Sequence, residues 1–368
     1  MTIRYHFKEY INKMAKKRKT LPSDFEEIVA NGNIEELKAI FDKCDINAYG
    51  GYWKGNALTF QGISEEFISW LVENGADVNA RDVWGNTPIS YQAEGNIDNL
   101  KLLLKLGADI EALNNYKCTP LCHVASSHHI IAVKALVENG ANVNSLNNDW
   151  SLPGKTPLEY ALHRCDNINI RAMVIIADIL LAAGAIITPD MKTRVLEIGK
   201  TFEFYRANFN KKYLKETEEA LNQLYERFGV QPVVKRITHD GVSPIQVKSA
   251  TWQEQFAELW ELLIPGSGHA STVQGEVVRI IGKVSREILD NGACNWNKEY
   301  KKLPQALPGY FAMGHFSDPQ DFKEVEALAK SISANCEDEV FTRLRKLAVK
   351  WVLLNPKPIA LHHVDYER

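Results

Sequence analysis

Three polar residues in the C-terminal third of the chain have side chains that could carry out catalysis. Glu276 and Arg279 follow a glycine-rich stretch at 265–268, and His315 lies in GHFSDP. Glu276 or His315 could act as a general base, and Arg279 could hold an anionic substrate. The motif context is missing, because GSG lacks the GxxxxGK[ST] spacing of a phosphate-binding loop and Glu276–Arg279 has the i,i+3 spacing of an ordinary pair on a helix surface. We therefore predict no catalytic residues, with an enzyme whose active site lies in 249–368 as an alternative.

A cysteine–histidine cluster in the first half of the chain raises the question of a metal site. Cys118, Cys122 and His123 lie close together, and His128 and His129 follow. A structural zinc site needs four ligands, and no second CxxC or HxxxH pair completes the set. We predict neither a metal nor a cofactor. The six cysteines of the chain are scattered, which is typical of a protein in a reducing cytosol.

A sequence repeat predicts the helices and turns that would position such residues. Glycine recurs in NGAD, LGAD, NGAN and AGAI, and Thr-Pro recurs at intervals of 32 and 37 residues. Proline suits the first turn of a helix, where its missing N–H costs nothing, and glycine suits the left-handed cap that ends a helix. Between these signals, apolar residues recur at helical spacing. The repeated positions are Gly75, Gly107, Gly140 and Gly184, and Thr87, Thr119 and Thr156.

Residues 24–188 resemble ankyrin repeats, in which TP(L/I) opens one helix and xGA(D/N) closes the next. The resemblance implies an all-α, ankyrin-repeat solenoid of helix–turn–helix repeats with β-hairpin-like turns, whose concave face usually binds proteins. We count about five units, of which the first, 24–48, is a cap and the last carries two insertions. The TPLH histidine, which commonly ties neighbouring repeats together, is replaced by Ser90, Cys122 and Glu159. This departure predicts a less rigid stack.

Every internal unit places a large aromatic residue in its turn. In the family that the sequence resembles, the residue three before the threonine of DxxGxTP projects from the tip of the turn. These rings either pack on one another and add only stability, or anchor a partner, and we favour the second because exposed Trp and Tyr are enriched at binding hot spots. The predicted partner-binding residues are Trp53 (beside Tyr52), Trp84, Tyr116 and Trp150 in the turns, and Tyr91, His123 and Tyr160 on the adjacent inner helices.

The segments around the repeats complete the predicted domain organisation. The region after the repeats should contain helices that open at Thr251 and Ser271, and two more at about 319–335 and 338–354. The predicted division is 1–23 as a basic helical leader, 24–188 as ankyrin repeats, 189–232 as a helical pair that covers the end of the stack, 233–248 as a hairpin or linker, and 249–368 as a helical C-terminal domain.

Composition narrows the function. A net charge of −3 over 368 residues gives no basic field for nucleic acid. No apolar run approaches the ~18 residues of a membrane span, and the N-terminus lacks the apolar core of a secretory signal, so we expect a cytoplasmic protein. We predict non-catalytic protein–protein binding, as an inhibitor or immunity-type protein that sequesters a toxin or enzyme. The alternative binder is a scaffold or effector that engages a host protein. The oligomeric state stays open.

Overall fold

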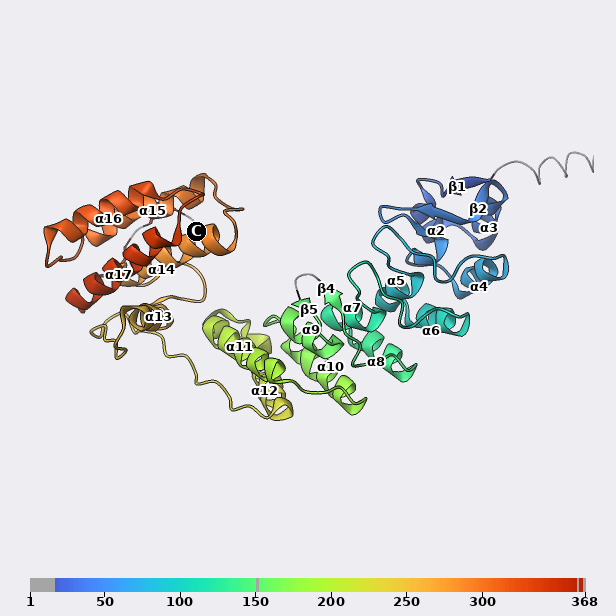
Figure 1. Ribbon diagram of the computed structural model, residues 1–368, viewed down its shortest axis with the longest axis horizontal. Coiled ribbons are helices and arrows are strands. Elements are labelled where there is room, and N and C mark those ends of the chain that lie inside the picture. Colours follow the sequence, from blue (N-terminus) through green and yellow to red (C-terminus); the bar gives the residue numbers. More distant parts are fainter. Residues whose placement is uncertain (1–16, 150–151, 363, 367–368) are drawn as a thin grey trace, which may run out of the picture. The chain divides into compact units, whose positions relative to one another are not determined.

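The structure, a computed structural model, describes residues 17–149, 152–362 and 364–366. It divides into two compact units. The first is built from Met1–Ile198 and Lys215–Pro232, and the second from Gly199–Leu214 and Val233–Arg368 (Figure 1). Helices dominate both units, so the predicted all-α fold class is confirmed.

The first unit is a series of helical pairs that follow one another along the chain (Figure 1). In the second pair, where GNALTF replaces the Thr-Pro motif, the first helix is a single 3₁₀ turn. The pairs are α2 (Phe25–Asn31) with α3 (Ile34–Lys43), η1 (Ala57–Thr59) with α4 (Glu65–Glu73), α5 (Pro88–Gly95) with α6 (Ile97–Lys105), α7 (Pro120–Ser126) with α8 (Ile130–Glu138), and α9 (Pro157–Arg164) with α10 (Ile170–Ala182).

The helix boundaries lie where proline, threonine and glycine predict them. Pro88, Pro120 and Pro157 occupy first turns. The Thr119 hydroxyl caps its helix by accepting a hydrogen bond from the backbone N–H of Cys122 at 3.2 Å. The glycines that follow the second helices of four pairs have φ between +89° and +97°. This left-handed conformation is costly for any residue with a Cβ atom, which explains the recurrent glycine.

Apolar side chains from successive pairs form the core of the first unit. Phe67, Leu100 and Val133 come from three different pairs, and each is fully buried. Burying one such side chain contributes about 1.5–3 kcal/mol, and a single pair could not bury its own apolar face. A polar contact also ties two pairs together, because the buried amide of Gln92 donates a 2.9 Å hydrogen bond to the carbonyl of Leu58.

Short strands form the start of the first unit. β1 (Arg18–Thr20) pairs in parallel with β2 (Cys44–Gly50), which in turn pairs antiparallel with β3 (Gly55–Asn56). The prediction of a helical leader over 1–23 was therefore wrong for its end, because hydrogen bonding to β2 holds this stretch extended. The rest of that prediction, residues 1–16, lies outside the residues that the structure describes.

One insertion of the last repeat lies in a turn, and the other reaches into a helix. The first forms a small hairpin of β4 (Asn148–Asp149) and β5 (Leu152–Pro153) between α8 and α9. The second, CDNINIRAM at 165–173, supplies the loop that joins α9 to α10 and the first turn of α10. Neither insertion interrupts a helix.

The helical pair predicted after the repeats consists of α11 (Pro189–Tyr205) and α12 (Lys211–Phe228), separated by the 3₁₀ turn η2 (Arg206–Asn208). Several hydrogen bonds and ion pairs join the pair to the last repeat. The Nε of Arg194 donates to the carbonyl of Leu162 at 3.1 Å, and Arg227 forms a 2.6 Å ion pair with Asp178. The segment 199–214 nevertheless groups with the second unit, so the two units share this pair.

The second unit packs its helices around a core that includes Phe311, Phe341 and Trp351, all fully buried. The capping box predicted at Thr251 is present, with both of its hydrogen bonds to Glu254. The helices are α13 (Trp252–Leu263), α14 (Val273–Ser285) extended by the π-helical turn η3 (Arg286–Asp290), α15 (Lys298–Phe311), α16 (Pro319–Ser331) and α17 (Asp338–Leu354).

Two segments of the second unit bear on the sequence-based expectation. The segment 233–248, expected as a hairpin or a linker, forms no strand and is irregular. Helix α15 was not predicted, because Pro304 and Pro308 lie inside it and proline normally ends a helix. Its apolar side, with Leu303 and Leu307 fully buried, packs into the core and offsets the lost backbone hydrogen bonds.

Across the ranges 17–149, 152–362 and 364–366, none of the helices combines the length and apolar character that crossing a bilayer requires.

Candidate functional site

The turns between repeats place an aromatic residue at the same point because their side chains and backbone repeat one geometry. The Asp82 carboxylate accepts hydrogen bonds from the backbone N–H groups of Trp84 and Asn86, each at 2.8 Å. Asn114 plays the same part in the next turn, accepting from Tyr116 N–H at 2.9 Å. These turns follow the pattern by which Asp and Asn side chains fix local backbone. The aromatic residue is therefore held in a defined place.

Backbone hydrogen bonds link each turn to the next. The N–H of Val83 donates to the carbonyl of Trp53 at 3.1 Å, and the N–H of Asn115 donates to the carbonyl of Trp84 at 2.9 Å. The residue after each aromatic takes a left-handed conformation, with φ of +54° at Lys54, +77° at Gly85 and +56° at Lys117. The turns thus form a ladder that sets the spacing of the aromatic rings.

The rings form one continuous series, which we call the aromatic row: Tyr52, Trp53, Trp84 and Tyr116. Successive ring centroids lie 4.4, 6.2 and 6.0 Å apart. The exposed fractions are 83% for Tyr52, 43% for Trp53, 39% for Trp84 and 38% for Tyr116. The rings therefore pack on one another, as a stabilising role requires, and still expose over a third of their surface, as contact with a partner requires. Trp150, predicted to belong with them, lies outside the residues that the structure describes.

The predicted inner-helix residues Tyr91 and His123 lie on α5 and α7 and have polar partners. The Tyr91 hydroxyl donates to the buried carboxylate of Asp82, and burial together with this carboxylate raises the pKa of Tyr91. His123 Nε2 lies 3.2 Å from the carboxylate of Glu94. The hydrogen bond from His123 is the main reason that the pKa of Glu94 is lowered. Both side chains are partly exposed, so they remain candidates for contact with a partner.

Tyr160 is a correction. Its side chain is only 7% exposed and packs with Cys118, Cys122 and Leu152, the last of these in the inserted hairpin. Arg164 covers the ring, with its guanidinium carbon 5.4 Å from the ring centroid. Tyr160 therefore belongs to the interior and offers no surface to a partner.

Two members of the cysteine–histidine cluster, Cys122 and His129, have structural roles. Cys122 is buried and its sulfur accepts a 3.2 Å hydrogen bond from the Asn147 amide, which belongs to the next turn. His129 caps α8 through its Nδ1. Among the residues that the structure describes, no three His, Cys, Asp or Glu side chains come together as metal ligands.

Two of the residues that replace the TPLH histidine form hydrogen bonds to later segments. The Asn147 amide of the next turn donates to the Cys122 sulfur, and the Thr188 hydroxyl, at the end of the last repeat, donates to the Glu159 carboxylate at 2.8 Å. Glu159 also completes a capping box with Thr156. Cys122 thus links its repeat to the next turn, whereas Glu159 links the start of α9 to the segment that precedes α11.

In the alternative site in the second unit, Glu276 and Arg279 form a buried ion pair, whereas the sequence predicts an ordinary pair on a helix surface. Glu276 is fully buried and Arg279 is 2% exposed. The guanidinium binds both carboxylate oxygens, at 2.8 and 2.6 Å, and the carboxylate also accepts hydrogen bonds from the N–H of Ala270 at 3.0 Å and the hydroxyl of Tyr366 at 2.6 Å. Burial by itself raises the pKa of Glu276, but these partners, Arg279 foremost, outweigh it and lower that pKa below its usual 4.5.

This network leaves Glu276 poorly suited to act as a base. Its two oxygens already have four donors, and its lowered pKa makes proton uptake unfavourable near neutral pH. His315 is exposed, and its backbone N–H donates to the Asn355 side chain at 2.8 Å. No sequence motif predicts that Tyr366 belongs to this network. Its hydroxyl also lies 3.0 Å from that of Tyr310.

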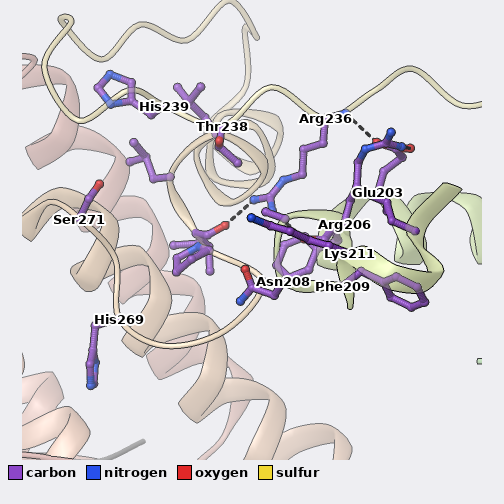
Figure 2. A pocket seen from close by; sticks show the side chains of 18 residues that line it. Glu203, Arg206, Asn208, Phe209, Lys211, Arg236, Thr238, His239, His269 and Ser271 are labelled. Atoms are coloured by element: carbon purple, nitrogen blue, oxygen red, sulfur yellow. Dashed lines mark hydrogen bonds and ion pairs between the residues drawn. The ribbon is translucent and has the colours of Figure 1, made fainter. Parts of the chain in front are cut away.

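A pocket of about 490 Å³ lies in the second unit, and its lining residues include His269, which Figure 2 labels. The Nδ1 of His269 lies 3.3 Å from the Glu276 carboxylate. Both arginines that line the pocket bind other groups of the protein. Arg236 donates to four backbone carbonyls and lies 4.1 Å above the Phe204 ring, and Arg206 forms a 2.9 Å ion pair with Glu203. Arg236 therefore acts as a tie between 199–214 and the end of α13.

Known proteins resemble the repeat region. Residues 93–183 match the family model for ankyrin repeats (3 copies). An ankyrin repeat protein of variola virus is 36% identical over 90 residues, which is 24% of this chain and 16% of the relative. A protein of fowlpox virus, also named for ankyrin repeats, is 46% identical over 83 residues, or 22% of this chain and 12% of the relative. An ankyrin repeat protein of vaccinia virus is 29% identical over 126 residues, or 29% of this chain and 22% of the relative.

These matches establish the class of the repeat region. The chain contains ankyrin repeats, as predicted, and such repeats are modules of protein–protein interaction. The matched segments span less than a quarter of the curated relatives' length. The second unit lies outside the residues that the family model matches.

Proposed function

We propose that this chain binds a protein partner through the aromatic row and the adjoining parts of α5 and α7. One observation carries the proposal: Trp53, Trp84 and Tyr116 stay 38–43% exposed although their rings contact one another. An exposed Trp or Tyr at the centre of an interface commonly contributes about 2 kcal/mol or more to binding. A contiguous row of such rings is a surface suited to a partner and uncommon on a surface that has none.

Binding through the aromatic row would cost little side-chain entropy. The turns are linked by backbone hydrogen bonds from Val83 to Trp53 and from Asn115 to Trp84, and each ring packs against its neighbour. Ordering a side chain at an interface costs about 0.5–1.5 kcal/mol when the side chain is mobile in the free protein. Rings that are already ordered avoid most of this cost, which favours a stable complex.

The charges beside the row favour an acidic partner segment. Lys54 and Lys117 each follow an aromatic residue and are exposed. Within the described part of the chain neither ammonium group has an ion-pair partner. The carboxylate of the Trp84 turn, Asp82, is buried and accepts the Tyr91 hydroxyl. A partner with acidic side chains next to apolar ones therefore complements this surface.

More specifically, we propose that binding blocks the activity of the partner. The protein would act as an inhibitor or immunity-type protein that sequesters a toxin or enzyme by covering its working surface. The alternative is a scaffold or effector, whose partner keeps its activity in the complex. The two differ in one measurement, the activity of the purified partner with and without a stoichiometric amount of this chain.

Affinity capture with the tagged full chain tests the binding surface. The variant Trp84→Ala/Tyr116→Ala removes the centre of the row, and we expect it to lose the partner that the native chain retains. The matched control is Ile131→Ala/Ile168→Ala, which removes apolar side chains that are 63% and 73% exposed elsewhere on the same unit. This control should retain the partner.

Each capture is compared at equal protein concentration, after circular dichroism shows that all three proteins are folded. If both variants retain the same partner as the native chain, the aromatic row is not the interface and its contacts only stabilise the repeats. If the control loses the partner as well, the interface lies elsewhere on the unit. A partner lost only with Trp84 and Tyr116 supports the proposal.

A further inference from the structure

A second cavity in the second unit has four cationic side chains and one carboxylate among its lining residues. It encloses about 580 Å³, a size suited to a small ligand. Lys200, Arg279, Lys283 and Arg286 line it, and Glu261 is the one carboxylate among its lining residues. The whole chain has a net charge of −3, so this concentration of cations does not follow from composition.

The cations are brought together by one helix and the end of another. Arg279 and Lys283 are four residues apart and Arg286 follows three residues later, so all three share one face of α14 and its continuation η3. Lys200 comes from α11, in the segment 199–214 that belongs to the same unit. Like charges at this spacing repel one another and destabilise a helix. The arrangement therefore has a cost that an anion in the cavity would remove.

Part of the charge is already neutralised inside the protein. Arg279 pairs with the buried Glu276, and Glu261 lies 3.1 Å from the Nε of Arg236. Lys200 and Arg286 are exposed, and among residues 17–149, 152–362 and 364–366 their side chains have no hydrogen-bond or ion-pair partner. In the pocket of Figure 2, by contrast, both arginines, Arg206 and Arg236, bind other groups of the protein.

The loop at 265–268 also lines the cavity. A Cβ atom at Gly266 would lie 3.0 Å from the carbonyl oxygen of Phe204, so the loop runs in tight contact with α11 at this glycine. The backbone N–H groups of Ser267 and Gly268 donate to no other residue that the structure describes. Backbone N–H groups beside cationic side chains are a common setting for anions. Tyr205, 41% exposed, adds a ring at the edge of the cavity.

We propose that this cavity binds a phosphorylated small molecule, a role separate from the protein binding assigned to the aromatic row. A phosphate group carries a charge near −2 and several strong acceptor oxygens, which match Lys and Arg donors converging from two elements. The phosphates lie between Lys200 and Arg286, against the free N–H groups of the loop. The ring of Tyr205 borders the rest of the ligand.

The test is a titration of the full chain with two probes, inorganic pyrophosphate and ATP, followed by calorimetry at about 50 mM salt, where charge attraction is weakly screened. We expect saturable binding of at least one probe. In Lys200→Gln/Arg286→Gln the dissociation constant should rise on the order of tenfold, since two charge-assisted contacts are removed. Both residues are exposed, so the variant should fold like the native chain.

The matched control is Lys323→Gln/Lys346→Gln, which removes two exposed cations of the same unit outside the cavity. Its affinity for the probe should equal that of the native chain. The proposal is overturned if neither probe binds saturably at concentrations up to the order of 1 mM. It is equally overturned if the two double variants lose affinity to the same extent, because the effect would then reflect total charge and not the cavity.

Discussion

Trp84 and Tyr116 stack across two successive turns, with ring centroids 6.0 Å apart and ring planes inclined by 17°. Trp84 also meets Trp53 on its other side, at 6.2 Å. It is therefore the central ring of the row and the one whose removal breaks both contacts.

Trp84→Ala should reduce stability far less than it reduces binding. Aromatic pairs contribute about 0.5–1.5 kcal/mol beyond their buried area, and Trp84 is partly solvated already, so we expect the free energy of unfolding to fall by about 1–2 kcal/mol. Partner affinity should fall by roughly 2 kcal/mol or more, about thirtyfold. Urea denaturation and titration with the captured partner measure the two quantities. Trp84→Phe keeps a ring and should recover part of both; if it recovers neither, stacking is not the source of the effect.

Two helical glycines of the second unit should respond to alanine in opposite ways. A Cβ atom at Gly282 would lie 2.1 Å from the Trp260 ring, whereas a Cβ atom at Gly309 has no neighbour within 4 Å. Gly282→Ala should therefore lower the free energy of unfolding by about 1–3 kcal/mol through overpacking. Gly309→Ala should raise it by up to about 1 kcal/mol, because alanine favours the helix. Equal melting temperatures for the two variants would show that the Trp260 ring can move aside.

Glu276→Gln should destabilise the second unit strongly. The substitution leaves Arg279 buried without its counter-charge, and breaking a buried ion pair in this way costs about 3–5 kcal/mol. The control is Glu324→Gln, which breaks the half-exposed Arg343–Glu324 pair and should cost less than about 1 kcal/mol. Chemical denaturation followed by tryptophan fluorescence measures both. A small loss in Glu276→Gln would mean that water or a rearranged Tyr366 replaces the lost charge.

Mild acid should weaken the first unit through His128. Burial lowers the pKa of His128 below its usual 6.5, and burial likewise lowers that of His163. The folded state thus binds fewer protons than the unfolded state, so this contribution to stability is complete above pH 6.5 and is lost as the pH falls through the lowered pKa. His128 has a φ of +56°, a conformation that asparagine tolerates. His128→Asn should therefore show a smaller loss of melting temperature between pH 7.5 and pH 5.5 than the native chain.

The repeat region was predictable because its signals are local. Pro120 and Thr119 mark a helix start, and a glycine with positive φ marks a helix end, without reference to anything distant in the chain. The position of Tyr160 was not predictable in the same way. It corresponds to Tyr91 and His123 in the repeat, but the inserted hairpin brings Leu152 over it and Arg164 covers the ring.

The second unit was less predictable because its decisive contacts are remote or unusual. Glu276 and Arg279 are three residues apart, a spacing that exposed and buried ion pairs on a helix share. Their burial depends on packing against distant segments such as the one that carries Tyr366, and the local sequence does not show this. Pro304 and Pro308 contradict a helix locally, while the burial of α15 against the core supports it. Tertiary packing overrides the local preference in such cases.

The hydrogen bond from Tyr366 to Glu276 spans 90 residues, and its consequence concerns synthesis on the ribosome. At translation rates of about 5–20 residues per second, α14 emerges on the order of ten seconds before the segment that carries Tyr366. During that interval the Glu276 carboxylate lacks one of its four donors, and Gln274 lacks the backbone partners at Asn355, Lys357 and Ile359 that it holds in the finished fold. The second unit therefore completes this network only after the segment 355–366 has been made, while the first unit, with its neighbour-to-neighbour contacts, can fold repeat by repeat during synthesis.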